Sequence, residues 1–390
     1  MKCEDKFRQI YRKDPSGLAF CPYRVCPIGA HIDHQFGKIT GFAIDKGIHI
    51  AYAPKLNGVV ELCSLQFPKR AQWHVRAVPD EKRGDWADYL RGATLELGQR
   101  YPLKYGISGV IEGSLPIGGL SSSAAVIISY LKALCSVNGL SLDEFELITV
   151  AKDAEFKYVG VSCGKLDQSC EVLCRKDHLL YLDTLDDSFE LIEKSPSMKP
   201  FKLLILFSGL ERNLAGSKYN MRVDECVSAA YALKAFAGMD YGKFCDTHLR
   251  EVPFEVYERY KDRLPETWRR RAEHYYGEFS RVELGAEAWR RGDIEEYGRL
   301  CFESGRSSIE CWETGSPELK SLYELMRRTD GIYGGRFSGA GFKGCCMALV
   351  DPDFAESAAE AIERGYLAEF PALEGKFASF ICDTADGAIA

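Results

Sequence analysis

The chain has 390 residues, of which 46% are hydrophobic and 27% charged, and its net charge is −7. This length favours two packed domains over one core, and the ordinary composition excludes a largely disordered chain. The negative charge argues against a dedicated nucleic-acid binder, which usually carries a basic surface. Phosphate can still be bound by local groups, because such binding does not depend on the total charge.

Compartment and membrane association are constrained by the N-terminus and by the fifteen cysteines. Residues 1–10 are charged throughout and lack the apolar run of a secretory signal. No stretch approaches eighteen consecutive apolar residues, so we expect no membrane span. An odd number of cysteines without a signal predicts reduced thiols in the cytoplasm. The spacing of Cys163, Cys170 and Cys174 matches no common zinc pattern, and we expect buried thiols there.

The first half alternates short apolar runs with glycine-rich turns. We expect strands at residues 39–44, 48–53, 58–64 and 106–113, and helices at about 86–101 and 124–135. A polar stretch with two prolines at 193–200 predicts a domain junction, which divides the chain into residues 1–195 and 196–390. Beyond it come an apolar strand at 203–207, helical periodicity over 220–328, and glycine-rich strands at 331–350. This pattern predicts two α+β domains that meet at a cleft.

The segment from Leu115 to Ala125 joins a glycine-rich turn to the start of a serine-rich helix. Gly118 and Gly119 allow a tight turn that brings backbone N–H groups close to phosphate oxygens. The helix that begins near Ser121 adds its positive dipole end, and its three serine hydroxyls can bind phosphate or Mg²⁺. Read alone, the segment is also compatible with an ordinary serine-capped helix. No Walker-type sequence is present.

Three segments together resemble the GHMP kinases, named for galacto-, homoserine, mevalonate and phosphomevalonate kinases. Residues 115–125 resemble the second GHMP motif, and residues 337–346 resemble the C-terminal glycine-rich motif. Residues 21–34 resemble the galactokinase motif Ala-Pro-Gly-Arg-Val-Asn-Leu-Ile-Gly-Glu-His-Thr-Asp-Tyr. The resemblance implies the two-domain GHMP kinase fold, of α+β class, with the active site between the domains and with ATP and Mg²⁺ as co-substrate and cofactor. The ATP-binding residues that it implies are Trp86, Pro116, Gly118, Gly119, Leu120, Ser121, Ser122, Ser123 and Ala124.

Residues 155–168 resemble the galactokinase stretch that ends in Gly-x-x-Asp-Gln. The resemblance implies that Asp167 is the general base, or at least the acceptor that orients the anomeric hydroxyl. It places Arg24 beside this carboxylate, where a guanidinium keeps the acid ionised and neutralises developing charge. It also implies that Glu155 and Ser123 hold Mg²⁺, with Ser122 as a further candidate. Taken alone, an Asp after Gly-x-x is more typical of a turn.

The sugar-binding residues also follow from the resemblance. It implies that His31 and Asp33 bind ring hydroxyls and that Gly164 and Tyr219 line the sugar pocket. Read alone, residues 31–34 are also compatible with a metal pair or a surface turn. Residues 270–274 and 316–319 match helical landmarks of galactokinases, and we expect packing roles for them.

Ala30 stands where galactokinases carry a Glu whose carboxylate reaches toward the C6 hydroxyl of galactose. A uronic acid carries a carboxylate at C6, and two like charges about 4 Å apart cost roughly 4 kcal/mol at an effective dielectric near 20. Ala30 therefore favours a uronic acid as acceptor, and residues 22–35, 166–169, 219–223 and 336–346 are similar to galacturonokinases. This resemblance implies the reaction of D-galacturonate and ATP to α-D-galacturonate 1-phosphate and ADP.

The sequence leaves open which residue neutralises the C6 carboxylate and which sugar is the acceptor. Candidate cations for the C6 carboxylate are Arg222, Lys218, Lys165 and His34, and we prefer Arg222 because its fork can bind a carboxylate bidentately. Galactose, arabinose or glucuronate 1-kinases are the nearest alternatives. A sensor without turnover is a further one, although such a protein typically loses the base and the metal ligands. We expect a sugar acid and ATP as partners, neither nucleic acid nor membrane, and a monomer or weak homo-oligomer.

Overall fold

The computed structural model describes residues 1–116, 118–210 and 216–388, without the side chains of 216–218. A large mixed sheet occupies the N-terminal part, with strands in the order β4-β3-β5-β2-β6-β7 and with β1 and β12 both paired to β2. Its strands are β1 (Gly17–Val25), β2 (Lys38–Lys55), β3 (Val59–Ser64), β4 (Ala71–His74), β5 (Gly106–Gly113), β6 (His178–Asp183), β7 (Phe189–Glu193) and β12 (Thr384–Ala385).

Strand β2 corrects one of the sequence predictions. Residues 39–44 and 48–53 were expected as two strands, but they form one strand of 18 residues that spans the sheet. Gly47 permits this continuity, because a Cβ there would lie 2.1 Å from the Cys21 carbonyl oxygen of β1. The neighbouring strand adapts as well, since the β1–β2 register shifts between Pro22 and Tyr23. A bulge and a close backbone approach thus replace the predicted turn.

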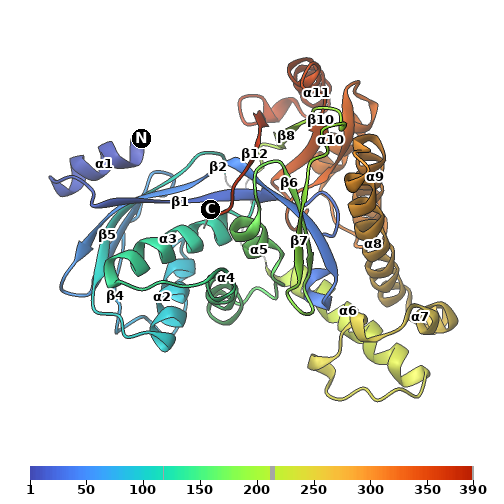
Figure 1. Ribbon diagram of the computed structural model, residues 1–390, viewed down its shortest axis with the longest axis horizontal. Helices are drawn as coiled ribbons and strands as arrows, with labels where there is room; N and C mark the ends of the chain where they lie inside the picture. The colour runs from blue at the N-terminus through green and yellow to red at the C-terminus, as the bar shows by residue number, and fades with distance from the viewer. Residues whose placement is uncertain (117, 211–215, 389–390) are drawn as a thin grey trace.

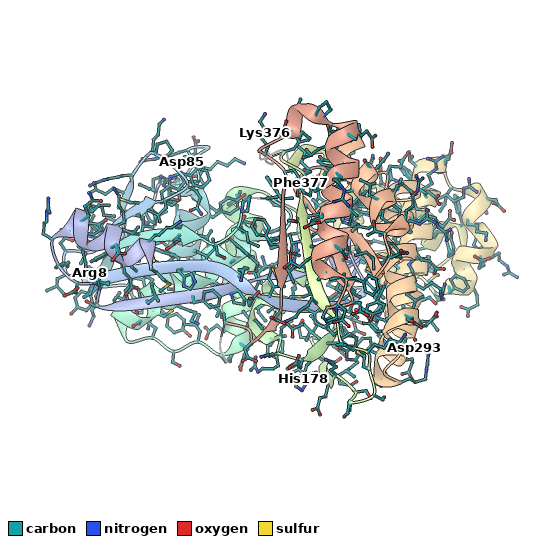
Figure 2. The ribbon with its side chains drawn as sticks, turned by 90° about the horizontal axis from the view of Figure 1, so that it is seen from above. Arg8, Asp85, His178, Asp293, Lys376 and Phe377 are labelled. Atoms are coloured by element: carbon teal, nitrogen blue, oxygen red, sulfur yellow. The ribbon has the colours of Figure 1, made fainter. Side chains whose placement is uncertain are left out.

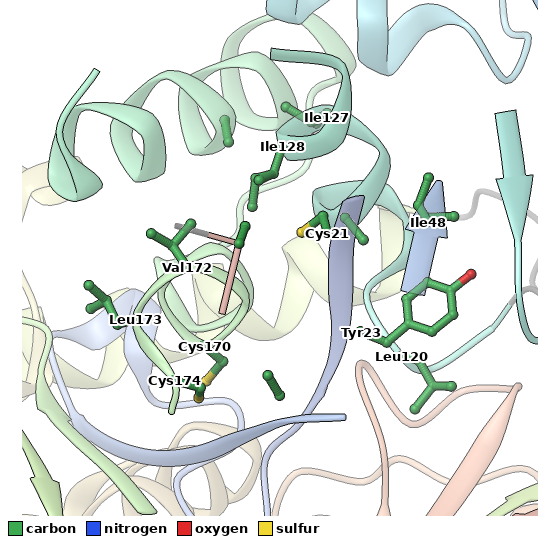
Figure 3. Close-up of a cluster of buried hydrophobic side chains, with 14 of the residues drawn as sticks. Cys21, Tyr23, Ile48, Leu120, Ile127, Ile128, Cys170, Val172, Leu173 and Cys174 are labelled. Atoms are coloured by element: carbon green, nitrogen blue, oxygen red, sulfur yellow. The ribbon is translucent and has the colours of Figure 1, made fainter. Parts of the chain in front are cut away.

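Helices cover one face of this sheet, as Figure 1 shows. They are α2 (Asp88–Arg100), α3 (Ser122–Asn138), α4 (Glu144–Asp153) and α5 (Leu166–Leu173), and α1 (Lys2–Tyr11) packs beside β5. The apolar side of α3 supplies Ile127 and Ile128 to the core, against Cys21 of β1 and Val172 of α5 (Figure 3). Burial of such side chains, at about 25 cal/mol per Å² of apolar surface, holds the helices on the sheet.

The C-terminal part has a four-stranded antiparallel sheet in the order β11-β8-β10-β9. Its strands are β8 (Lys202–Phe207), β9 (Ile332–Phe337), β10 (Cys345–Val350) and β11 (Ala378–Cys382). The helices of this part are α6 (Gly216–Phe236), α7 (Phe254–Tyr260), α8 (Glu266–Arg290), α9 (Ile294–Glu310), α10 (Pro317–Arg328) and α11 (Ala355–Glu369). Figure 2 shows the two parts side by side, with Asp85 in the first and with Asp293, Lys376 and Phe377 in the second.

Short helical turns complete the chain: η1 (Asp33–Gln35), the π-helix η2 (Ala154–Val159), η3 (Phe244–Asp246), η4 (Leu249–Glu251), η5 (Lys261–Arg263) and η6 (Pro371–Leu373). The predicted junction at 193–200 connects β7 of the large sheet to β8 of the small one. Strand β12, however, returns to the large sheet and pairs with β2, so the division at 195/196 stays a prediction. Within the described ranges, no helix has both the length and the apolarity needed to cross a membrane.

Candidate active site

A cavity of about 1010 Å³ lies between the loop at 118–121 before α3, called the phosphate loop below, the end of β1 and the segment between η2 and α5. Most of the sequence-predicted site residues line it: Arg24, Ala30, His31, Asp33, Trp86, Gly118, Gly119, Ser121, Ser122, Ser123, Glu155, Gly164, Asp167 and Tyr219. Pro116, Leu120, Ala124 and Arg222 do not. Leu120 and Ala124 are buried instead, and Leu120 lies beside Tyr23 in the core (Figure 3).

The loop before α3 has a backbone that favours glycine. Gly118 and Gly119 have φ values of 146° and 82°, and Ser121, which caps α3, has a φ of 55°. A Cβ at position 119 would lie 2.8 Å from the Cys345 sulfur. The Ser121 hydroxyl is buried without a hydrogen-bond partner among the described residues, and Ser122 and Ser123 line the same cavity. Unpaired donors at a helix N-terminus suit an anionic ligand such as phosphate.

The C-terminal glycine motif packs directly on this loop. A Cβ at Gly344 would lie 2.7 Å from the Gly118 carbonyl carbon, and one at Gly339 would lie 3.0 Å from the Gly119 carbonyl oxygen. Backbone therefore touches backbone between residues more than 200 positions apart, which only glycine permits. The two motifs, which the sequence shows separately, form one structural unit that fixes the phosphate loop.

Arg24 and Asp167 form a close ion pair at the cavity wall. The Arg24 Nε donates to Asp167 Oδ1 at 2.8 Å, and its Nη2 lies 2.7 Å from the same oxygen. Burial alone would lower the pKa of Arg24, but the Asp167 carboxylate outweighs it and raises this pKa. Arg24 Nη1 also donates to the Gly119 carbonyl at 3.3 Å. The guanidinium thus joins a carboxylate, whose side chain is 30% exposed, to the phosphate loop.

Glu155 and the serines at the start of α3 offer hard oxygen ligands in the same cavity. Glu155 sits in η2, is buried, and accepts a hydrogen bond of 2.5 Å from Gln168 Nε2. Among the described residues, no group of three or more His, Cys, Asp or Glu side chains could hold a metal alone. One carboxylate and one or two hydroxyls fit an Mg²⁺ ion whose remaining ligands come from nucleotide phosphates and water.

Asp33 and Gly164 are in contact with each other in the wall of the cavity. Asp33 Oδ2 accepts a hydrogen bond from the Leu166 N–H at 3.1 Å, and burial raises the pKa of Asp33 to about 6. A Cβ at Gly164 would lie 2.3 Å from Asp33 Oδ2, so a larger residue would displace the carboxylate. His31 and Tyr219 line the cavity nearby, and the His31 ring stacks on Trp312 at 5.0 Å between centroids.

Helix α8 holds the loop that carries Ala30 and His31. His274 Nε2 pairs with the Ala30 carbonyl oxygen at 3.0 Å, and the Gly29 N–H donates to Glu278 Oε1 at 2.7 Å. These anchors support unusual backbone angles, since Gly29 has a φ of 106° and His31 one of 67°. His274, which belongs to the segment 270–274 where we expect packing roles, therefore also positions the loop that carries Ala30 and His31.

Arg222, the preferred candidate for a C6 carboxylate, does not reach the cavity. Its Nη1 lies 3.2 Å from both Glu225 carboxylate oxygens, and its Nε donates to the Trp312 carbonyl at 3.1 Å. Lys165 also lies outside the cavity and binds the Asp187 carboxylate at 2.6 and 2.7 Å. The side chain of Lys218 lies outside the described residues. The structure therefore corrects the preference for Arg222, because acidic neighbours already neutralise it.

Near Trp86 the cavity is also lined by residues that no sequence motif indicates. Trp86 lines the cavity as expected and stacks on Phe67 at 6.0 Å between ring centroids. Lys69 and Lys82 line the same wall, and Lys82 Nζ donates to the Val159 carbonyl at 2.8 Å. Both lysines sit in polar loops, and the only available signal was their position between β3 and the Trp86 motif.

Cys163, Cys170 and Cys174 divide between the hydrophobic core and the cavity. Cys170 and Cys174 are buried in the hydrophobic core, as predicted. Cys163 is only partly buried and lines the cavity close to Gly164. All fifteen cysteines are free thiols.

Phosphoryl transfer to a small bound hydroxyl compound is the chemistry that this cleft can support, because it joins a phosphate loop, a carboxylate and a cation. The families described as GHMP kinases N terminal domain, GHMP kinases C terminal and galactokinase galactose-binding signature match residues 88–175, 286–368 and 5–54. These three matches within one chain define it as a GHMP kinase.

The most similar relatives that we compared are sugar kinases. The chain is 39% identical to a galacturonokinase of Arabidopsis thaliana, over 95% of this chain and 92% of that protein. It is 31% identical to a galactokinase of Roseiflexus sp., over 98% and 95%. A crystal structure of Lactococcus lactis galactokinase complexed with galactose matches with a TM-score of 0.88 and 26% identity, over 98% and 97%. The chain therefore belongs to the galactokinase family of the GHMP kinases and is a sugar-1-kinase.

Proposed function

We propose that the protein transfers the γ-phosphoryl group of ATP to the anomeric C1 hydroxyl of D-galacturonate, giving α-D-galacturonate 1-phosphate and ADP. The observation that carries this proposal is Ala30, which lines the cavity where galactokinases have a Glu. A methyl group there leaves room for a C6 carboxylate and removes a like charge from its surroundings. The 39% identity to a protein named galacturonokinase supports the same acceptor.

In this proposal the Arg24–Asp167 pair activates the sugar. Asp167 accepts the proton of the C1 hydroxyl, and Arg24, whose Nη2 lies 2.7 Å from Asp167 Oδ1, holds the carboxylate in place. As charge develops on the transferred group, Arg24 is close enough to the phosphate loop to stabilise it, because it already contacts the Gly119 carbonyl. Asp33, with Gly164 beside it, accepts hydrogen bonds from ring hydroxyls.

ATP lies along the phosphate loop with its base toward Trp86 and Phe67. Lys69 and Lys82 face the same part of the cavity and add positive charge near the nucleotide. Glu155 and Ser123 would hold Mg²⁺, which neutralises charge on the β- and γ-phosphates when bound. Free thiols and a requirement for ATP fit a cytoplasmic enzyme.

The test is a coupled ADP-release assay on D-galacturonate, D-glucuronate, D-galactose and L-arabinose at equal concentrations. We expect the highest kcat/KM with galacturonate and a lower one with glucuronate, which differs in configuration at C4. Galactose is the second candidate acceptor, favoured by the galactokinases among the relatives. A higher kcat/KM with galactose than with galacturonate would overturn the proposed acceptor.

A further inference from the structure

The segment at 160–165, called the linker below, connects the two elements that carry Glu155 and Asp167. It runs from the end of η2 to the start of α5. Its residues belong to no helix or strand. Four of them nevertheless line the cavity: Gly160, Val161, Cys163 and Gly164. The position of the linker is therefore part of the shape of the site, although no regular ladder of hydrogen bonds fixes it.

Both ends of the linker are held within the N-terminal part. The Gly160 and Val161 N–H groups donate to the Glu155 carbonyl at 2.9 and 3.1 Å, which caps η2. Beyond the other end, the Leu166 N–H donates to Asp33 Oδ2 at 3.1 Å. These bonds fix where the linker starts and ends, so its middle needs a separate anchor.

Asn220 supplies this anchor from the C-terminal part. Its Oδ1 accepts a hydrogen bond from the Ser162 N–H at 3.1 Å, and its Nδ2 donates to the Gly160 carbonyl at 3.2 Å. Both partners are main-chain groups with fixed roles, so only one orientation of the amide satisfies them together. Asn220 follows Tyr219 in α6, and both residues line the cavity. Two hydrogen bonds thus join α6 to the wall of the site.

The stability of α6 does not explain an asparagine at position 220. The residue lies inside this helix, where asparagine is a weaker helix former than alanine or leucine. Its two side-chain hydrogen bonds go to the linker and not to the backbone of α6. The side chain therefore acts on the wall of the cavity rather than on its own helix.

We propose that Asn220 is a positioning residue for phosphoryl transfer, which holds the linker so that the sugar is aligned with Asp167 and the phosphate loop. This inference rests on the proposed role of Asp167 but not on the identity of the acceptor. Without the two bonds the middle of the linker can withdraw from the cavity, and the C1 hydroxyl then loses its alignment. A misplacement of about 1 Å costs about a hundredfold in rate. Because the effect concerns alignment rather than initial binding, the loss should appear mainly in kcat.

The test measures kcat, KM for the sugar and the affinity for a non-hydrolysable ATP analogue in the full chain with Mg²⁺. The sugar is whichever of D-galacturonate and D-galactose the wild-type chain phosphorylates faster. Asn220→Leu removes both hydrogen bonds at nearly constant side-chain volume, and Asn220→Ala removes them with a smaller side chain.

The matched control is Asn138→Leu, because Asn138 makes similar bonds away from the site. At the end of α3, its Oδ1 accepts from the Lys104 and Tyr105 N–H groups at 2.9 and 3.0 Å, and its Nδ2 donates to the Tyr105 carbonyl at 3.0 Å. Asn138 is not among the residues that line the cavity. Its replacement therefore breaks a comparable set of bonds without touching the linker.

We expect kcat of both Asn220 variants to fall about a hundredfold, with a much smaller change in KM for the sugar and an analogue affinity within about threefold of wild type. Asn138→Leu should lower Tm to a similar extent as Asn220→Leu, while its kcat stays within about twofold of wild type. If one Asn220 variant does not fold, as thermal melting would reveal, the other decides.

An unchanged kcat in folded Asn220 variants would overturn the inference, because the role would then be structural only. A rise in KM alone would also overturn it, since it would indicate direct contact with the bound sugar. An equal loss of kcat in Asn138→Leu would overturn it as well.

Asp167→Asn, measured in parallel, separates this inference from the proposed function. A fully active Asp167→Asn would refute the proposed base and the positioning role together. An inactive Asp167→Asn beside fully active Asn220 variants would overturn the positioning role alone.

Discussion

Replacing Ala30 by Glu tests the proposed acceptor, because it adds a negative charge that should repel the C6 carboxylate of galacturonate. The Ala30 position is fixed, because its carbonyl oxygen pairs with His274 Nε2 and the Gly29 N–H donates to Glu278. The backbone therefore cannot move a new carboxylate away from the cavity that Ala30 lines. The new side chain and the C6 carboxylate of galacturonate would face each other across a short gap.

The size of the effect follows from Coulomb's law. At a separation of about 4 Å and an effective dielectric near 20, the repulsion is about 4 kcal/mol. Because 1.4 kcal/mol corresponds to a factor of ten, kcat/KM for galacturonate should fall by about a thousandfold. Galactose has no charge at C6, so its kcat/KM should fall far less or rise.

The matched control is Ala30→Gln, which adds nearly the same volume without the charge. We expect the Gln variant to retain much more activity on galacturonate than the Glu variant, as measured by ADP release over a range of sugar concentrations. Equal losses in the Glu and Gln variants would show that steric exclusion, not charge, determines the effect, and would refute the electrostatic argument.

Three further predictions concern the catalytic pair, the phosphate loop and the sugar pocket. Asp167→Asn should lower kcat in the ADP-release assay by about 10²–10⁴-fold, which is the usual range for the loss of a general base, while an ATP analogue still binds. Full activity of this variant would show that Asp167 is not the base. Gly344→Ala places a Cβ 2.7 Å from the Gly118 carbonyl carbon at a φ of 105°, so it should raise KM for ATP and lower Tm by a strain of about 1–3 kcal/mol. The control is Gly98→Ala in α2, where the added Cβ meets no atom closer than 3.7 Å, and it should stabilise the fold by about 0.5–1 kcal/mol. If the Gly344 and Gly98 variants changed KM for ATP equally, the contact between Gly344 and Gly118 would not explain the effect. Burial raises the pKa of Asp33 to about 6, so the Asp33 carboxylate becomes protonated as the pH falls through 6 and no longer accepts hydrogen bonds from the sugar. The kcat/KM for the sugar should therefore drop about tenfold for each pH unit below about 6. Asp33→Asn should lack this acidic limb, and a limb that persists would assign it to another group.

Motif positions and most element types could be predicted from the sequence because they depend on local patterns. The apolar helix after the phosphate loop, the strand at 106–113 and the strand at 203–207 all appear where periodicity and turn residues indicate them. Strand β2 was misjudged because Gly47 looks like a turn residue, whereas its actual role is close approach to β1. Such an approach depends on a partner strand that local sequence does not reveal.

Within the site, local patterns identified the residues but not their long-range contacts. No periodicity connects Gly118 to Gly344, or Ala30 to His274, although both contacts shape the cavity. Arg222 was preferred for its chemistry, and only the fold shows that Glu225 already binds it. Trp312 carried no signal in the sequence, because only the fold brings its ring against those of His31 and His34.

The most direct test of the central claim is a competition in one tube. Equimolar D-galacturonate and D-galactose are incubated with limiting ATP, Mg²⁺ and the protein, and the sugar phosphates are quantified by ³¹P and ¹H NMR. Because the product ratio equals the ratio of the two kcat/KM values, we predict α-D-galacturonate 1-phosphate as the main product. A majority of galactose 1-phosphate would contradict the account, and phosphate at a position other than C1 would contradict the role of Asp167.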